Sequence, residues 1–426
     1  MGESSPLLVP LGLCAGLVAL FLFRASPRAA FVAWSLVLFF VPIWVGATVG
    51  FFWAALTLMT IAAIVANLAD LRLAAVDGFV AAFALLVLAL FALELATLSA
   101  TVIAILQWML PYAWGRVVLA RLPARFVTRT IAAMATAAAV LALLEFATGL
   151  NPFVLIPGSG AVDEWSQLQT RASFLRAEGA FGHSIALGAS LAMSCSFIIA
   201  ARWRPAVMLL SLLAVIGAIV VTFSRIGLVT AGLAIAATIV FLPGIARGVR
   251  WTVATAGALA AAVVVPIVGI VFADAGGEAG GSAEYRIGLL SLLSQVELLG
   301  TAGEWSARAD DGISLGAYAG SVDNTALLIA LRFGWVPMLL VAAALGSIAI
   351  AMVTRRANPA AIAVASQLPA LFAVALITQF GMFLWFLAGL AVAWRIADDQ
   401  AATDAVLTDV SSHPPKRLQP GRAAAP

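Results

Sequence analysis

Long apolar stretches separated by short polar turns constrain this chain more than any other feature. Hydrophobic residues make up 64% of its 426 residues, and charged residues only 10%. Water-soluble domains do not have this balance, whereas a helix that crosses a bilayer needs about 17–25 mostly apolar residues. The sequence therefore predicts an all-α, polytopic membrane protein.

About 12–13 segments have the length and hydropathy of transmembrane helices. They cover residues 7–23, 30–46, 50–66, 78–98, 101–118, 128–149, 183–201, 206–223, 226–242, 251–272, 325–353, 360–378 and 380–396. We therefore predict one integral membrane helical domain over residues 1–396. Two larger extracytoplasmic loops, 150–182 and 273–323, interrupt it. The polar, proline-containing tail, 397–426, is expected to be disordered in the cytoplasm.

Basic residues fall mostly in short loops on one side of these segments. Threading the chain alternately through the spans places the following clusters on a single face: Arg24 and Arg28; Arg72; Arg116, Arg121, Arg125 and Arg129; Arg202 and Arg204; Arg247 and Arg250; Arg355 and Arg356; Arg395, Lys416, Arg417 and Arg422. Basic loops remain in the cytoplasm, so this face is cytoplasmic and the N-terminus lies outside. Because these loops account for the net charge of +3, the charge does not indicate a nucleic-acid partner.

A few arginines lie on the opposite side, where the distribution of charge places few basic residues. They are Arg171, Arg176, Arg225, Arg286 and Arg308. A guanidinium group suits phosphate particularly well, because its N–H donors match two phosphate oxygens at once. These arginines are therefore candidates for binding an anion, although the acidic neighbours of Arg308 favour a solvated salt bridge for that residue.

Two of these arginines precede a span together with a histidine. Arg171, Arg176 and His183 lie in RASFLRAEGAFGHSIALG (171–188), where Gly179 and Gly182 allow a tight backbone approach before a helix start. Glycines and arginines beside a helix N-terminus form a suitable anion site. The alternative for Arg176 is a pair with the neighbouring Glu178 that leaves the arginine at the membrane surface.

Arg225 and Arg286 are each held at the outer membrane surface by their surroundings. Arg225 lies in an almost loopless turn, TFSRIG (222–227), and a charge there is costly unless it is paired or functional. Contact with a lipid headgroup is the alternative. Arg286 opens the segment 284–299, whose apolar residues recur at helical spacing. That segment predicts an amphipathic helix at the outer interface.

Asp323 and Asn324 open the span that begins near Thr325. An aspartate in this position first suggests a helix N-cap. It could alternatively serve as a general base, since partial burial raises the pKa of a carboxyl group toward neutrality. His183 is the other candidate base, and its alternative role is that of a hydrogen-bonding residue at a helix end.

Several common site motifs are absent from the sequence. There is no Walker loop, no zinc-ligand spacing, no nucleophile elbow and no DxD pair that would hold a metal-bound nucleotide sugar. We therefore expect no metal and no cofactor. Cys14 and Cys195 lie within apolar runs, so a disulfide framework is not expected.

The segments EFATGLNPF (145–153), RASFLRAEGAFGHSIALG (171–188) and TFSRIG (222–227) together resemble the superfamily of O-antigen ligases and O-antigen or exopolysaccharide polymerases. YRIGLL (285–290), the Leu-Leu-Gly turn (298–300), DNTALLIALRFGW (323–335) and QWMLPYAWGRV (107–117) also resemble that family. The resemblance extends over most of residues 100–396, and the order of the short motifs carries it.

The resemblance implies a metal-independent C-type glycosyltransferase in the bacterial cytoplasmic (inner) membrane, with its active site facing the periplasm. The donor would be an oligosaccharide on polyprenyl diphosphate, transferred to a glycan acceptor, with a flippase and a chain-length regulator as possible partner proteins. By motif, Arg176, Arg225 and Arg286 would bind the diphosphate. Asp323 or His183 would orient or deprotonate the acceptor hydroxyl, supported by Arg171 and Asn324.

One position separates the functions within the superfamily. Ligases typically carry a histidine before the asparagine of the late motif, where this chain has Asp323, as exopolysaccharide and polymerase members do. The leading hypothesis is therefore a polysaccharide polymerase, and the alternative is a ligase that transfers glycan to a lipid or protein acceptor. A transporter or flippase is the alternative from another class, and it predicts charged or broken helices near mid-membrane.

Overall fold

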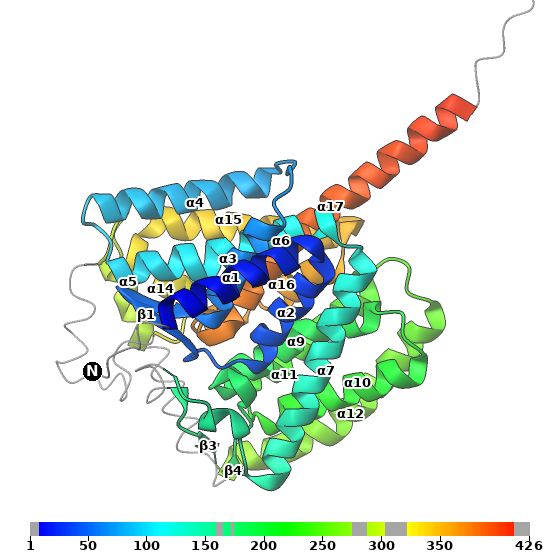
Figure 1. Ribbon diagram of the computed structural model, residues 1–426. Coiled ribbons are helices and arrows are strands. Elements are labelled where there is room, and N and C mark those ends of the chain that lie inside the picture. The colour runs from blue at the N-terminus through cyan, green and yellow to red at the C-terminus, as the bar shows by residue number, and fades with distance from the viewer. Residues whose placement is uncertain (1–7, 159–164, 172–173, 275–287, 303–321, 413–426) are drawn as a thin grey trace, which may run out of the picture.

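The computed structural model describes residues 8–158, 165–171, 174–274, 288–302 and 322–412 (Figure 1). Regular structure in these ranges is almost entirely helical, and its strands form two short antiparallel hairpins. The predicted all-α, polytopic membrane fold is confirmed.

The elements follow one another along the chain with short connections. The α-helices are α1 (Leu8–Ala25), α2 (Pro27–Phe40), α3 (Ala55–Ala66), α4 (Ala75–Ala92), α5 (Leu98–Val102), α6 (Leu110–Arg121), α7 (Ala124–Thr148), α9 (Ser184–Ala200), α10 (Pro205–Val221), α11 (Arg225–Phe241), α12 (Arg247–Asp274), α14 (Thr325–Phe333), α15 (Trp335–Ala351), α16 (Pro359–Ser366) and α17 (Thr378–Ser412). The strands are β1 (Gly46–Val49), β2 (Phe51–Ala54), β3 (Thr170–Arg171) and β4 (Phe174–Leu175). The 3₁₀ and π segments are η1 (Ile103–Met109), η2 (Pro152–Leu155), η3 (Gly179–Phe181), η4 (Ser291–Gln295), η6 (Met352–Arg356) and η7 (Ala370–Phe372).

Six helical stretches in the described residues are long and apolar enough to cross a membrane. They are Ala75–Ala92, Leu98–Arg121, Ala124–Thr148, Arg247–Pro266, Trp335–Thr354 and Thr378–Ala401. Seven further apolar helices are shorter. The 12 residues of α3, for example, rise only about 18 Å, against a hydrocarbon core of about 30 Å. The chain is a multi-pass membrane protein, and the number of 12–13 spans stays a prediction.

The predicted span 325–353 is wrong as a single helix. It is divided into α14 and α15 at Gly334, which has φ +97° and ψ 175°. A Cβ atom at Gly334 would lie 2.6 Å from the carbonyl oxygen of Leu298, so the backbone of the preceding loop packs directly against this break. Continuous apolar sequence conceals the break, because both helices are apolar.

The predicted span 360–378 is also not one continuous helix. α16 ends at Ser366, η7 follows, and α17 begins at Thr378. Pro369 provides the physical reason: it lacks the backbone N–H that a continuing helix requires, and it disfavours helical geometry at Leu368. Gln367 in this interruption is fully buried.

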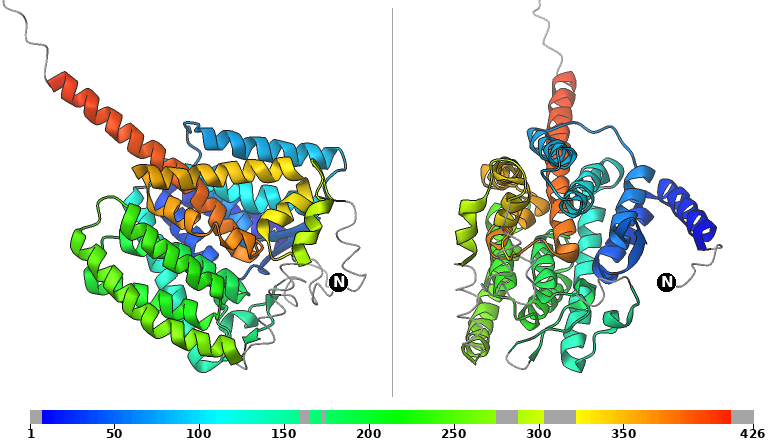
Figure 2. Two further views of the ribbon diagram at one scale, coloured as in Figure 1. Left: turned by 180° about the vertical axis from the view of Figure 1, so that it is seen from behind. Right: turned by 90° about the vertical axis from the view of Figure 1, so that its left-hand side faces the viewer.

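Two further segments depart from expectation. The predicted spans 30–46 and 50–66 are joined by the β1–β2 hairpin, which turns at Gly50 with φ +72°. The tail predicted to be disordered from residue 397 continues as α17 to Ser412, and Figures 1 and 2 show this helix projecting beyond the bundle. Repeated alanines favour helix there despite the polar composition. The remaining tail, 413–426, lies outside the described residues.

Three of the basic residues that the charge distribution assigns to one face, Arg116, Arg121 and Arg129, contact neighbouring helix ends and loops. The Nε atom of Arg116 lies 2.8 Å from an oxygen of Asp77 in a largely buried salt bridge. Arg121 donates to the carbonyl oxygen of Asn67, and Arg129 donates to that of Ala201, 3.1 Å away. We call this the basic end, and we call the opposite end of the bundle the outer end.

The central helix of the bundle is α9, in which every residue from Ser184 to Ile199 except Ile185 is buried. It packs against α7, α10, α11, α16 and α17. Gly188 faces Gly227 of α11 closely, so two glycines allow these helices to approach. The N-terminus of α9 is therefore fixed firmly, and it places the predicted site residues that precede it.

Candidate functional site at the outer end

The outer end is organised by the loop between α7 and α9. α7 ends in a left-handed cap at Gly149, whose φ is +70°. The loop then forms η2 and the β3–β4 pair, and it enters α9 through η3 and Gly182, whose φ is +61°. A Cβ atom at Gly182 would lie 2.6 Å from the carbonyl oxygen of Trp165, so glycine is required there for both conformation and space.

A buried carboxylate anchors this loop to the end of α7. Glu145 is only 3% exposed, and it accepts three hydrogen bonds from the loop. The donors are the side-chain amide of Asn151 at 2.9 Å, the backbone N–H of Glu178 at 3.1 Å and the backbone N–H of Gly179 at 2.8 Å. Sequence reasoning did not assign Glu145 a role, although a charged residue near the end of an apolar span was a signal.

Arg176 and Arg171 tie the loop to the turn that precedes α11. The Nε atom of Arg176 donates to the carbonyl oxygen of Thr222 at 2.9 Å. A terminal nitrogen of Arg171 donates to the carbonyl oxygen of Phe223 at 3.0 Å. Arg176 also donates to the side-chain oxygen of Gln169, and its charge interacts with Glu178, the partner that the alternative for Arg176 predicts.

The polar group around Arg176 includes a residue that the motifs did not single out. The side-chain oxygen of Gln169 accepts from Arg176 at 3.1 Å and from the hydroxyl of Ser184 at 3.1 Å. The backbone N–H of Gln169 donates to Glu178 at 3.0 Å. Gln169 thus connects the arginine with the first residue of α9.

Glu178 titrates near neutral pH in this surrounding. It is 1% exposed, and burial raises its pKa to about 7, with the charge of Glu145 raising it further. The hydrogen bond from Gln169 and the charge of Arg176 lower the pKa, but they do not offset burial. The charge of the outer end therefore depends on pH around neutrality.

His183 is the N-cap of α9, which was the structural alternative for this residue. Its Nδ1 atom accepts the backbone N–H of Ile185 at 3.2 Å, and its ring packs edge-on against Trp165. Burial, and then the charge of Arg176, lower its pKa to about 3. A neutral imidazole with so low a pKa binds a proton weakly, so His183 is a poor proton acceptor in this position.

Asn324, and not Asp323, caps α14. The side-chain oxygen of Asn324 accepts the N–H of Leu327 at 2.9 Å, which leaves the capping alternative for Asp323 wrong. Asp323 is half-buried. Its carboxylate is thus placed beside a capped helix start without serving as the cap.

The segment between η7 and α17 links α14 to the entrance of α9. The hydroxyl of Thr325 donates to the carbonyl oxygen of Val374 at 2.6 Å. Five residues later, the amide of Gln379 donates to the carbonyl oxygens of Val41 at 2.9 Å and Ala180 at 3.0 Å. These bonds link Thr325, two residues after Asp323, indirectly with Ala180, three residues before His183.

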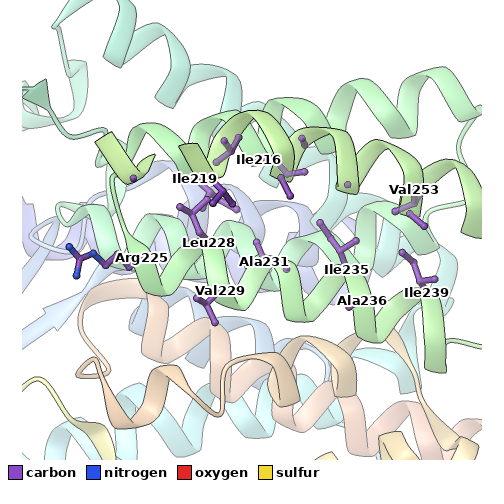
Figure 3. Close-up of a pocket in the computed structure, with 18 residues that line it drawn as sticks. Ile216, Ile219, Arg225, Leu228, Val229, Ala231, Ile235, Ala236, Ile239 and Val253 are labelled. Atoms are coloured by element: carbon purple, nitrogen blue, oxygen red, sulfur yellow. The ribbon is translucent and has the colours of Figure 1, made fainter. Parts of the chain in front are cut away.

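Arg225 is the exposed first residue of α11, behind the N-cap Ser224. It follows Thr222 and Phe223, the carbonyl partners of Arg176 and Arg171, by three and two residues, so three predicted arginines meet at this turn. Arg225 also lies at one end of an apolar groove (Figure 3). Arg286 and Arg308 lie outside the described residues, and the described part of the predicted 284–299 helix is a short segment that ends at Gln295.

No three His, Cys, Asp or Glu side chains gather as metal ligands would in the described part of the chain. Comparison with known protein families, with curated proteins and with solved structures finds no match to this chain. The resemblance in the sequence motifs is therefore the source of a functional hypothesis, and the structure adds the places where those motifs lie.

Proposed function

We propose that this protein is a polysaccharide polymerase that transfers a glycan from polyprenyl diphosphate to a sugar hydroxyl of a lipid-linked acceptor. One observation carries the proposal. Three of the segments that carry the resemblance, 145–153, 171–188 and 222–227, are separate in sequence but meet at the outer end through Glu145, Arg171 and Arg176. Because these segments resemble one enzyme family and also form one polar site, their proximity supports the proposal that they belong to one active site.

The proposed reaction needs two groups from the protein. The acceptor hydroxyl oxygen forms a bond to the anomeric carbon of the donor sugar, the bond from that carbon to the diphosphate breaks, and the hydroxyl proton passes to a base. Arg176 and Arg225 at the outer end, together with Arg286, stabilise the negative charge that develops on the departing diphosphate. Asp323 is the preferred base, and Asn324 holds the helix start beside it.

The buried contacts of Arg176 give it a second task. By bonding to Thr222 and Gln169 it positions the turn that carries Arg225, and its charge adds to the positive potential around that turn. Arg171 supports the same turn through Phe223. In this proposal the exposed Arg225 contacts the diphosphate, while the loop arginines hold it in place.

The setting of the proposed reaction is the outer leaflet of a bacterial inner membrane. Donor and acceptor both arrive on polyprenyl diphosphate, so a flippase that delivers them and a chain-length regulator are expected partners. The gathering of basic loops at the end opposite the site supports this orientation, since such loops stay in the cytoplasm.

A glycan-length assay tests the proposal in cells that lack the gene and carry a plasmid copy of it. Arg225→Lys is the principal variant, because Arg225 is exposed and the change should leave the fold intact. We expect polymer length to fall strongly, since lysine cannot provide two parallel donors. Arg286→Lys should act in the same direction, and Arg204→Lys, at an exposed position of the basic end, is the matched control.

Each outcome of that assay has a distinct meaning. Loss of polymer with accumulating single lipid-linked repeat units supports polymerisation. Accumulation of full-length lipid-linked polymer supports a ligase instead. Normal polymer from both Arg225→Lys and Arg286→Lys would reject the arginine roles.

One observation favours a transporter as the second candidate. The chain between α16 and α17 is interrupted within an apolar region, where Gln367 is buried and its side-chain oxygen has no hydrogen-bond partner among the described residues. Interrupted helices of this kind are typical of transporters. Movement of a lipid-linked sugar across liposomes by the purified protein, with no glycan made, would reverse the order of the two proposals.

A further inference from the structure

A cavity of about 670 Å³ lies at the basic end, where α4 and α16 begin and α15 ends beside α17. Its charged lining residues are Arg356 of η6 and Arg395 and Asp399 of α17, and Ile350 of α15 contributes apolar wall. We call this cavity the basic pocket. It is remote from the candidate site, which occupies the outer end.

The walls of the basic pocket are held together by direct contacts between helices. α4 and α15 lie side by side in Figures 1 and 2, and α15 also contacts α16 and α17. The side-chain nitrogen of Asn358 donates to the carbonyl oxygen of Ala391 at 3.1 Å, and its side-chain oxygen accepts the N–H of Ala361 at 2.9 Å. These three residues line the pocket, so its inner wall is a fixed part of the fold.

The charges of the lining leave one arginine without an acidic partner. A terminal nitrogen of Arg356 lies 3.5 Å from a carboxylate oxygen of Asp399, so these two charges largely offset each other. Arg395 is half-buried, and within the described ranges it forms neither a hydrogen bond nor an ion pair. The pocket therefore carries one positive charge in excess, and it attracts an anion.

The pocket lies at the level where membrane-spanning helices end. Three of the stretches that are long enough to cross a membrane reach it, and they are Ala75–Ala92, Trp335–Thr354 and Thr378–Ala401. Val76, Thr354 and Asp399 line the pocket, and each lies within two residues of the end of its stretch. Such ends meet the boundary between hydrocarbon and lipid headgroups.

The rim of the pocket is apolar and open to the surroundings. Ile350 is 66% exposed although it lies within a membrane-spanning stretch, and the neighbouring Val353 is 59% exposed. In a bilayer such side chains face acyl chains, so the pocket opens sideways toward lipid as well as toward its charged lining. A free phosphate would use the arginine but would leave this apolar side without a partner.

We infer that the basic pocket binds an anionic phospholipid of the leaflet at the basic end, with the phosphodiester at Arg395 and an acyl chain along Ile350. A guanidinium group donates to two phosphate oxygens at once, and basic pockets between membrane helices suit such headgroups. The chain's own residues 413–426 are not the occupant that charge favours, because they include Lys416, Arg417 and Arg422 and no acidic residue. The site is independent of the reaction proposed for the outer end.

Native mass spectrometry of the full-length protein in a non-ionic detergent tests the inference. Phosphatidylglycerol is the probe, and its binding is compared with that of phosphatidylethanolamine, which carries no net charge. We expect one site that prefers phosphatidylglycerol and that inorganic phosphate does not displace. Arg395→Gln should weaken this binding about fivefold, the effect of one arginine near an anionic headgroup.

Asp399→Asn provides a change in the opposite direction. It removes the acidic group of the lining and releases Arg356 from its pair, so phosphatidylglycerol should bind about fivefold more tightly. Asp399 is 57% exposed, and the change should leave the fold intact. This variant carries the test by itself if Arg395→Gln does not fold.

Arg204→Gln is the matched control, because Arg204 is an exposed arginine of the basic end that does not line the pocket. Its affinity for phosphatidylglycerol should equal that of the wild type. Wild-type affinity in either folded pocket variant would overturn the site. Equal binding of phosphatidylethanolamine would show that charge does not select the lipid, and displacement by phosphate would replace the lipid with a free anion. Either result would also overturn the inference.

Discussion

Glu145 shows how one side chain can organise the loop of the candidate site. Its two carboxylate oxygens take hydrogen bonds from Asn151, Glu178 and Gly179, which lie on both sides of the loop. Asn151 also donates to the carbonyl oxygen of Gly179 at 3.1 Å, so the two halves of the loop are joined directly. The position of Arg176, two residues before Glu178, therefore depends on a carboxylate that does not face the proposed substrate.

Replacement of Glu145 by alanine tests this dependence. The change leaves buried N–H donors without their acceptor, at a cost of about 1–3 kcal/mol for each unsatisfied group, so we expect a loss of at least about 3 kcal/mol in the free energy of unfolding. Thermal and denaturant unfolding in detergent measures it. Glu297→Ala, at an exposed glutamate, should stay within about 0.5 kcal/mol of the wild type. Equal stability of the two variants would contradict the anchoring role.

Glu178 makes the charge of the candidate site depend on pH. Folding raises its pKa from an ordinary 4.5 to about 7, so the group is neutral in the folded protein below pH 7 and charged above it. Its contribution to stability is therefore complete below about pH 4.5 and is lost as the pH rises through 7. Neutral Glu178 leaves the outer end one unit more positive.

We therefore expect sulfate, an anion whose own charge is constant in this range, to bind more tightly at pH 6 than at pH 8. The difference should be about threefold, because one unit of charge near a hydrated surface contributes on the order of 0.5–1 kcal/mol. Calorimetric titration at the two pH values measures it. Glu178→Gln should remove most of the difference, and a variant that keeps the full pH dependence would show that another group titrates.

The sequence indicated which arginines belong to the candidate site, but it did not indicate which residues they contact. Arg171, Arg176 and Arg225 stood out because they oppose the charge bias of the loops, and they meet at one turn. Gln169 lies outside every motif, and Thr222 opens TFSRIG without any sign that its carbonyl oxygen holds an arginine. Their positions follow from tertiary packing of α9 against α11, which periodicity within a single segment does not reveal.

At the scale of elements, breaks in apolar segments matter as much as the helices. Gly334 and the region around Pro369 interrupt segments that hydropathy treats as continuous. Mean hydropathy shows whether a segment is apolar enough for the bilayer, but it does not show where a helix inside that segment ends. Gly334 and Pro369 are the local signs of these breaks in the sequence. Whether such a residue ends a helix depends on the backbone that packs against it.

Gly334→Ala should destabilise the outer end. The residue has φ +97°, and an added Cβ would lie 2.6 Å from the Leu298 carbonyl oxygen, so strain of about 1–3 kcal/mol adds to a direct collision. Gly346→Ala on α15 is the control. Its surroundings are open, and alanine in a helix interior should stabilise by about 0.5–1 kcal/mol. We expect the unfolding temperature to fall in Gly334→Ala and to rise in Gly346→Ala. A rise in both variants would show that the chain does not require glycine at the break between α14 and α15.

At the scale of the whole molecule, the uneven distribution of arginines between loops matches the arrangement of the helices. Loops that carry arginine meet at one end, and the polar site forms at the other end around the N-termini of α9, α11 and α14. The all-α membrane class and the grouping of basic loops followed from composition and threading. The lengths of individual helices did not, because α2, α3 and α16 end where turns and packing interrupt apolar sequence.

The orientation of the molecule decides whether the proposed reaction is possible, and paired cysteines test it. Leu155 near the site is 82% exposed, and Leu73 at the basic end is 83% exposed, so accessibility alone does not favour either. Leu155→Cys and Leu73→Cys are made in a background with Cys14→Ala and Cys195→Ala, and a membrane-impermeant maleimide is added to spheroplasts. We expect labelling of Leu155→Cys in intact spheroplasts and of Leu73→Cys only after permeabilisation, because arginine-rich loops stay in the cytoplasm. The reverse pattern would place Arg176 and Arg225 in the cytosol, where a donor at the outer leaflet does not reach them.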